Sequence, residues 1–337
     1  MKIKPEESSF DFIAIGDTVV DAFIKLNQAE EIDDNIHNTR KLCMSFGDKI
    51  PFESVEIISG VGNSPNAAVS ASRLGLKTAL ISNVGTDTYG TDCLNHYKQE
   101  GIDTCFINIQ KDKITNYHFV LWFKNDRTIL IKHEHYNYNL PSLGLPRWIY
   151  LSSLGENSLS FHQELFSYLK DHPTIQLVFQ PGTFQMKLGT EALKEIYKRT
   201  KLFFCNVQEA MHILKTENLD IRVLLKKIAE LGPEIVVITD GPAGSYAYNK
   251  ASNTSWFMPV YPDPKEPYER TGAGDSFAST FTSAIALGKS IPEALKWGSI
   301  NSMSVVQYVG AQKGLLTQEQ IRGYLDNAPE GWDVKEI

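Results

Sequence analysis

The chain has 337 residues, with 33 Lys and Arg against 40 Asp and Glu, which gives a formal net charge of −7. Hydrophobic residues make up 42% and charged residues 22%, which is the composition of an ordinary globular protein and excludes a disordered or fibrous chain. The length predicts about two domains, or one large domain with an appendage, and it needs neither disulfides nor a structural metal to fold. The acidic balance argues against nucleic acid as the main partner, but it is compatible with a local basic pocket for phosphates.

The cysteines and the first residues predict a soluble protein of the cytoplasm. No Cys-x-x-Cys pair occurs, and we expect reduced, buried thiols at Cys43, Cys93, Cys105 and Cys205. Residues 1–7 include acids and lack the apolar core of a signal peptide. No apolar run approaches the ~20 residues that a membrane span needs, so we expect no membrane partner.

Six short apolar runs predict strands, and amphipathic stretches between them predict helices. The runs are 12–15, 77–84, 148–151, 175–179, 201–205 and 234–239. Apolarity without alternation is typical of strands that are buried on both faces. Helical patterns cover 66–74, 91–100, 158–170, 191–198, 207–214 and 221–231. This repetition predicts an α/β fold, a doubly wound and mainly parallel sheet with helices on both faces.

Two regions break this rhythm. Residues 115–123 and 128–132 read as a hairpin that turns at 124–127, and the polar stretch 25–39 reads as a loop. These regions suggest a small β-rich lid on a larger α/β domain. We assign residues 17–57 and 105–137 to the lid, and 1–16, 58–104 and 138–337 to the large nucleotide-binding and catalytic domain.

A glycine-rich turn precedes an apolar helical pattern at Gly272-Ala273-Gly274-Asp275. The first backbone N–H groups of a helix lack partners within it, and the helix dipole adds positive charge, so this turn predicts an anion hole for phosphate oxygens. Asp275 is either a good residue for a helix start or a general base that takes a proton from a hydroxyl attacking the bound phosphate.

The same four residues resemble the C-terminal signature of the ribokinase-like (PfkB) carbohydrate kinase family. Residues 60–68 and 72–76 resemble its N-terminal signature, a glycine pair followed by an Asn and by a helix that ends in Arg-Leu-Gly. Val61 stands where the first glycine of the pair usually lies. Residues 84–90 resemble the family's next motif, Gly-x-Asp-x-x-Gly. The resemblance extends over about residues 10–315.

The resemblance implies an ATP-dependent kinase that transfers the γ-phosphoryl group to a hydroxymethyl group of a small sugar. Asp275 is then the general base, and the backbone of Gly272, Ala273 and Gly274 is the anion hole. Asn206 and Glu209 match the family's Asn-x-x-Glu motif, in which Glu209 assists Mg²⁺ through water. Without the resemblance, Asn followed three residues later by Glu indicates a helix N-cap box.

The remaining site residues also follow from the resemblance. Those implied for substrate binding are Asp21, Gly62, Asn63 and Asn66. Those implied for nucleotide binding are Asn206, Thr239, Gly241, Gly244, Ser299 and Asn301. In many members the lid strands pair between subunits, so a homodimer through the lid is expected.

Two residues before the glycine turn depart from the family's pattern. Glu269 replaces an acid that helps to form a monovalent cation site in some members, which places K⁺ activation in doubt. Arg270 either clamps the transferring phosphate or points to solvent.

Several other signals are set aside. Gly288-Lys289-Ser290 reads as a helix end rather than a P-loop. His133 and His135 read as exposed hairpin residues rather than a metal pair. Phe119, Trp122 and Phe123 read as lid packing or a dimer contact rather than a nucleobase stack.

Three alternative functions follow from the same residues. A nucleoside kinase of the same family would need an aromatic slot, which Tyr117 and the three lid aromatics offer if they face inward. A dinucleotide oxidoreductase would carry Gly-x-Gly-x-x-Gly after the first strand, and residues 16–19 do not. A non-catalytic sugar-binding regulator would be expected to lack the base at Asp275.

Overall fold

The structure is a computed structural model of the chain and describes residues 10–34, 39–124 and 126–337. Residues 1–7, where we expected no signal peptide, lie outside the described residues. Within the described ranges, no helix combines the length and the apolar character that a bilayer span requires.

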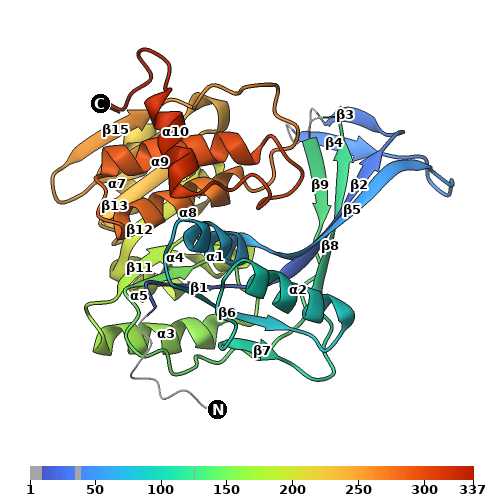
Figure 1. The fold of residues 1–337 in the computed structure, drawn as a ribbon, viewed down its shortest axis with the longest axis horizontal. Coiled ribbons are helices and arrows are strands. Elements are labelled where there is room, and N and C mark those ends of the chain that lie inside the picture. Colours follow the sequence, from blue (N-terminus) through green and yellow to red (C-terminus); the bar gives the residue numbers. More distant parts are fainter. Residues whose placement is uncertain (1–9, 35–38, 125) are drawn as a thin grey trace.

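A ten-stranded sheet, the large sheet, occupies the centre of the larger part of the molecule (Figure 1). Its strands in spatial order are β16 (Lys335–Glu336), β15 (Thr254–Met258), β14 (Ser245–Asn249), β13 (Ile235–Thr239), β12 (Thr200–Asn206), β11 (Gln176–Phe179), β10 (Trp148–Leu151), β1 (Phe12–Ile15), β6 (Thr78–Val84) and β7 (Ile107–Ile109). The strands from β13 to β7 are parallel, and β14 to β16 are antiparallel. All six predicted strands are confirmed to within one residue at either end.

Helices cover both faces of the large sheet, because its strands bury successive side chains on opposite sides. Phe12 and Ala14 join one apolar cluster, and Ile13 and Ile15 join the other. The first face is covered by α1 (Asn63–Arg73), α2 (Thr88–Gln99), α8 (Ala273–Ala286), α9 (Ile291–Val305) and α10 (Gln318–Asp326). The second is covered by α3 (Leu159–Asp171), α4 (Thr183–Ala192), α5 (Lys194–Arg199), α6 (Val207–Leu214) and α7 (Ile221–Glu230). The predicted doubly wound fold is confirmed.

A second sheet, the small sheet, stands at the side of this body (Figure 1). Its strands in spatial order are β5 (Phe52–Val61), β2 (Val19–Leu26), β8 (Asn116–Phe123) and β9 (Asp126–Leu130). The pair β2–β8 is parallel, and the other two pairs are antiparallel. The predicted hairpin is therefore present as β8 and β9. Residue 125, in its expected turn, lies outside the described residues.

The expected loop at 25–39 is wrong in part. It contains the end of β2, the strand β3 (Glu30–Asp34) and the start of β4 (Thr39–Cys43), and β3 and β4 form a two-stranded ribbon. Residues 35–38 lie outside the described residues. The ribbon is exposed, and Arg40 reaches Glu31 and Asp33 across it, so its polar sequence carries no burial pattern that would reveal strands.

The expected lid boundaries also differ from the sheets in detail. Within the range 105–137, β7 pairs with β6 in the large sheet. Strand β5 continues to Val61, past the expected boundary at 57. The phosphate-loop look-alike at 288–290 follows the C-terminus of α8, as expected for a helix end.

Only two of the four thiols are buried, Cys93 and Cys205. Cys43 is half-buried and Cys105 is exposed, so our expectation of buried thiols is wrong for both. Cys105 lies in the turn before β7, the last strand of the large sheet, where no further layer covers it.

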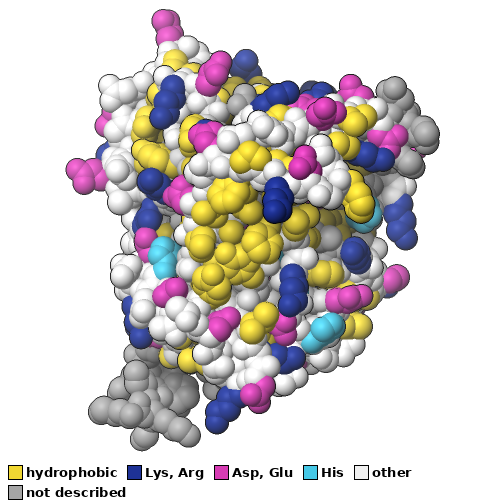
Figure 2. All heavy atoms as spheres, turned by 90° about the vertical axis from the view of Figure 1, so that its right-hand side faces the viewer, with side chains coloured by type: hydrophobic (Ala, Val, Ile, Leu, Met, Phe, Trp, Pro, Cys, Tyr) yellow, Lys and Arg dark blue, Asp and Glu magenta, His cyan; other side chains and the backbone are white. Residues whose placement is uncertain are grey.

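The outer face of the small sheet is apolar. The register aligns Ile57, Ala22, Phe119 and Leu130 in one row across its four strands. Ile57, Phe119 and Leu130 are each about half exposed, and Figure 2 shows a hydrophobic patch at the centre of this side of the molecule. A contiguous apolar patch of this kind marks an interaction surface.

Candidate active site

A cleft of about 370 Å³ lies between the small sheet and the carboxyl ends of the parallel strands. Gln180 follows β11, and Asn206 and Thr239 end β12 and β13. Asp21 and Arg127 line it from β2 and β9 of the small sheet. Ligand sites in open α/β sheets lie at this carboxyl edge.

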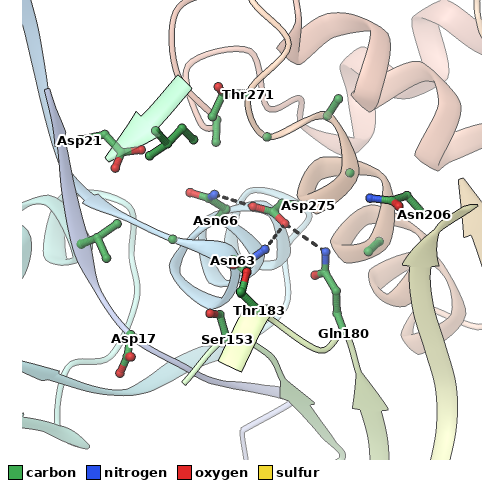
Figure 3. A pocket seen from close by; sticks show the side chains of 18 of the residues that line it. Asp17, Asp21, Asn63, Asn66, Ser153, Gln180, Thr183, Asn206, Thr271 and Asp275 are labelled. Carbon is green, nitrogen blue, oxygen red and sulfur yellow. Dashed lines mark hydrogen bonds between the residues drawn. The ribbon is translucent and has the colours of Figure 1, made fainter. Parts of the chain in front are cut away.

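Asp275 lies in the first turn of α8, half-buried at the centre of the cleft (Figure 3). Its Oδ1 accepts hydrogen bonds from Asn63 Nδ2 at 2.7 Å and from Gln180 Nε2 at 3.1 Å, and its Oδ2 accepts one from Asn66 Nδ2 at 2.9 Å. Burial raises the pKa of the Asp275 carboxyl, and the three amides act in the opposite direction. The carboxylate is thus held in one orientation as a stronger base than an exposed aspartate.

The orientation of Asn66 is itself held. Gln312 Nε2 donates to Asn66 Oδ1 at 2.9 Å and also to the carbonyl oxygen of Gly60. This bond leaves the amide nitrogen of Asn66 for Asp275. Asn63 and Asn66, predicted as substrate residues, therefore contact the predicted base directly. Gln180 and Gln312 were missed, because no motif contains them.

The glycine turn forms the predicted helix start. The first helical bond runs from Ser276 N to Gly272 O, so the N–H groups of Ala273, Gly274 and Asp275 have no partner within α8. Gly272 has φ +81°, and a Cβ there would lie 2.2 Å from Ala311 Cβ. Only glycine fits this close approach, and the turn it permits places the three N–H groups beside the cleft.

For Asn206 and Glu209, the interpretation as a helix N-cap box is confirmed, and the role toward magnesium stays a prediction. Asn206 Oδ1 accepts from Glu209 N, and Glu209 Oε2 accepts from Asn206 N, so they form a capping box at the start of α6. Both residues also line the cleft. Burial raises the pKa of the Glu209 carboxyl, and the nearby charge of Asp275 adds to this effect.

These residues fit a magnesium ion. Mg²⁺ in kinases takes one or two carboxylates together with waters and substrate phosphates, rather than a cage of protein ligands. Among the described residues, no group of three or more His, Cys, Asp and Glu side chains is arranged so that it could hold a metal ion by itself. A cation near Glu209 would relieve the repulsion between its carboxylate and that of Asp275.

A smaller pocket of about 100 Å³ adjoins the anion hole and shares Thr239, Ala273 and Gly274 with the cleft. Most of the residues predicted for nucleotide binding line this pocket, namely Thr239, Gly241, Gly244 and Ser299. Asn301 does not belong to it. Asn301 is fully buried, donates to Thr280 Oγ1 and accepts from Leu316 N, so our assignment of Asn301 to the nucleotide is wrong. It lies on the face of α9 that packs into the core.

At the end of the cleft away from this smaller pocket, the carboxylates of Asp17 and Asp21 face the imidazoles of His133 and His118. Asp21 Oδ1 lies 3.3 Å from His118 Nδ1. Asp17 is buried and accepts from Tyr138 Oη at 2.9 Å, and its Oδ2 lies 3.1 Å from His133 Nδ1. Gly62, at the start of α1, also lines this end, and so do both histidines.

The expectation for His133 is wrong. It lies after β9 rather than within the hairpin, and its ring turns inward against Asp17 and Phe184. His135 is exposed, as expected. Spacing along the chain does not reveal such a contact, because His133 and Asp17 are 116 residues apart.

None of the four lid aromatics, which are Tyr117, Phe119, Trp122 and Phe123, lines the cleft. Trp122 is buried against Tyr268, with ring centroids 5.0 Å apart, and Phe119 lies on the outer face. The phenylalanines at the cleft are instead Phe184 of α4, which carries no sequence signal, and Phe204 of β12, which is almost fully buried.

The two departures from the family pattern lie in different surroundings. Arg270 is exposed and lines the cleft beside the anion hole. Glu269 is 2% exposed, and its Oε1 accepts from the N–H and the hydroxyl of Thr271.

Comparison with known proteins shows the family of the chain. Residues 32–318 match the pfkB family of carbohydrate kinases. The chain is 26% identical to a ribokinase of Haemophilus influenzae over 84% of this chain and 92% of the relative, and 25% identical to a 5-dehydro-2-deoxygluconokinase of Geobacillus thermodenitrificans over 96% and 95%. An Arabidopsis thaliana ribokinase solved with ribose and ATP has the same fold, with a TM-score of 0.78 at 17% identity over 94% of this chain and 99% of that one. The chain belongs to the pfkB family of carbohydrate kinases and is a phosphotransferase with an alcohol group as acceptor.

Proposed function

We propose that this protein transfers the γ-phosphoryl group of ATP to a hydroxymethyl group of a small sugar. The observation that carries the proposal is the position of Asp275. Its oriented carboxylate and the unpaired N–H groups at the start of α8 open into the same cleft. A base and an anion site in one cleft are what in-line phosphoryl transfer to a hydroxyl requires.

Asp275 accepts the proton of the attacking hydroxyl. Its raised pKa improves it as a base, while the bonds from Asn63, Asn66 and Gln180 keep one carboxylate geometry. The free N–H groups at the start of α8, those of Ala273, Gly274 and Asp275, stabilise the charge that develops on the transferred group. Arg270, exposed at the same edge, acts as a clamp on that group.

Magnesium supplies charge neutralisation between the phosphates when it is bound. Glu209 would hold the ion through water, with Asn206 beside it, because both residues line the same cleft as the anion hole. The nucleotide itself extends into the adjoining pocket, where Thr239, Gly241, Gly244 and Ser299 meet. A K⁺ ion is not required, because a guanidinium, that of Arg127, already faces Glu269.

The acceptor lies between Asp275 and the small sheet, where Asp21, Gly62 and the imidazoles of His118 and His133 offer hydrogen bonds to hydroxyl groups. The cleft wall therefore favours a sugar over a nucleoside. The lid aromatics that a nucleobase slot would need lie elsewhere. Of the two phenylalanines at the cleft, Phe204 is buried in the core, which leaves the ring of Phe184.

The small sheet acts as a lid, because Asp21, Arg127 and His118 reach the cleft from its inner face. Its outer face, where Figure 2 shows a hydrophobic patch, pairs in this proposal with the same face of a second copy of the chain. Closure excludes water and so limits ATP hydrolysis.

A substrate panel tests the proposal. The purified chain with MgATP is offered ribose, fructose, 5-dehydro-2-deoxygluconate, adenosine, cytidine and inosine in a coupled ADP assay, and phosphorus NMR locates the new ester. We expect turnover with at least one sugar and no turnover with the nucleosides. Turnover with nucleosides alone favours the nucleoside kinase, and sugar binding without ADP release favours the non-catalytic regulator.

A further inference from the structure

A buried carboxylate organises the loop that leads into the anion hole. Glu269 Oε1 accepts from Thr271 N at 2.8 Å and from Thr271 Oγ1 at 2.6 Å. These two bonds determine how the chain enters Gly272, the residue from which the N–H groups of the first turn of α8 are presented. A carboxylate that is removed from water in this way requires a cationic partner as well as neutral donors.

The partner comes from the small sheet. Arg127 lies on β9, lines the cleft, and places its Nε 3.6 Å from Glu269 Oε1. This distance is slightly longer than a hydrogen bond. Arg127 Nε and Glu269 Oε2 are both buried, and neither has a hydrogen-bond partner among the described residues. The side chains of Arg127 and Glu269 therefore face each other without forming a hydrogen bond.

A small movement of β9 toward the cleft would bring the guanidinium into hydrogen-bond distance of both carboxylate oxygens, because its planar fork matches a carboxylate. Hydrogen bonds in enzyme sites often tighten only when substrate is bound. The loop 269–272 and β9 belong to opposite walls of the cleft, so this bond would connect the two walls.

We propose that Arg127 is a positioning residue for phosphoryl transfer: when the small sheet closes, its guanidinium bonds to Glu269 and fixes the loop that presents the anion-hole amides. The proposal rests on the proposed function. Arg127 acts through Glu269, so its removal lowers kcat and leaves the affinity for ATP in the free enzyme largely intact.

If the ion pair only stabilised the fold, stability and activity would change together in the variants. Two variants, one single and one double, distinguish this structural role from a positioning role. Arg127→Gln leaves a buried, unpaired carboxylate and destabilises the protein, whereas Arg127→Gln combined with Glu269→Gln removes both charges and recovers stability. A purely structural pair would then recover activity as well. A positioning pair would not, because the charged link across the cleft is still missing.

The experiment measures melting temperature, kcat, and the KM values for ATP and for the sugar identified in the substrate panel. We expect Arg127→Gln to lower kcat about 10²-fold, the cost of a misplacement near 1 Å. Added guanidinium ion should restore part of this kcat. The double variant should melt close to the parent and remain slow. Recovery of parental kcat by the double variant, or an unchanged kcat in Arg127→Gln, overturns the proposal.

Two control variants separate the role of Arg127 from the loss of any guanidinium and from a failure to fold. Arg40→Gln removes an exposed guanidinium of the neighbouring β3–β4 ribbon, which pairs with Glu31 and does not line the cleft, and it should leave kcat unchanged. Arg127→Lys keeps the charge and supports folding but cannot form the fork, so a low kcat in this variant is expected even if Arg127→Gln does not fold. A parent protein without kinase activity overturns the proposed function, whereas an active parent with a fully active Arg127→Lys variant and double variant overturns only the role of Arg127.

Discussion

Replacing Gly272 by alanine tests whether the turn before α8 positions the anion hole. Gly272 has φ +81°, and an added Cβ would lie 2.2 Å from Ala311 Cβ and 2.5 Å from Ala311 Cα. The second atom belongs to the backbone, so a rotamer change cannot relieve the overlap. Either the turn or the segment around Ala311 must shift.

The magnitude follows from two costs. A left-handed conformation costs a residue with a Cβ about 1–2 kcal/mol, and an extra methyl group in a filled space costs about 1–3 kcal/mol. We therefore expect Gly272→Ala to lower the free energy of unfolding by about 2–5 kcal/mol. Displaced amides no longer meet the developing charge, and the loss of one such donor lowers kcat about 10²–10³-fold.

Urea unfolding and the coupled ADP assay measure the two effects. Gly323→Ala, in α10, is the matched control, because an added Cβ there meets no atom within 4 Å. We expect it to stabilise slightly, since glycine within a helix costs about 0.5–1 kcal/mol relative to alanine, and to leave kcat unchanged. If Gly272→Ala behaves like this control in both assays, the turn does not position the amides.

Three further predictions concern the base, the cation and the lid. The pKa of Asp275 is raised, and only its charged form is a base. We therefore expect kcat to fall as the pH is lowered through a value above the ordinary pKa range of aspartate. A fall in kcat that occurs only within the ordinary aspartate range would contradict this. Replacing KCl by tetramethylammonium chloride should leave kcat unchanged, because the guanidinium of Arg127 already supplies a positive charge facing Glu269. Strong activation by K⁺ would count against this role of Arg127. Phe119→Asp, on the half-exposed apolar face, should shift sedimentation toward monomer, whereas Leu145→Asp, at another exposed apolar position, should not; a parent chain that is monomeric at all concentrations excludes the dimer.

The layers of the fold were predictable because both faces of the large sheet are buried. A strand such as β1 or β10 is then a continuous apolar run between polar turns, and its boundaries are visible in the sequence. The exposed ribbon of β3 and β4 has no such contrast. Its strands are held by backbone pairing and surface charges, so the sequence there resembles a loop.

The site was predictable where one turn of chain forms it. Gly272 to Asp275 are consecutive, and Asn206 and Glu209 are three residues apart, so spacing alone places them together. The partners of Asp275 were not predictable in the same way. Gln180 is 95 residues away from Asp275 in the sequence, and Asn63 is 212 residues away. Only the packing of the strands and helices brings these side chains into contact with it.

Asn301 shows the opposite error. Its neighbour Ser299 lies on the pocket side of α9, but a residue two positions along a helix points to a different face, and Asn301 bonds within the core.

In the proposed mechanism, the carboxylate of Asp275 accepts the hydroxyl proton while backbone amides hold the phosphates. Asp275→Asn tests it most directly, through ATP affinity by calorimetry and the rate of a single turnover with the accepted sugar. We predict that ATP affinity and melting temperature stay close to those of the parent and that phosphoryl transfer slows about 10²–10⁴-fold. Transfer at the parental rate would show that Asp275 is not the base.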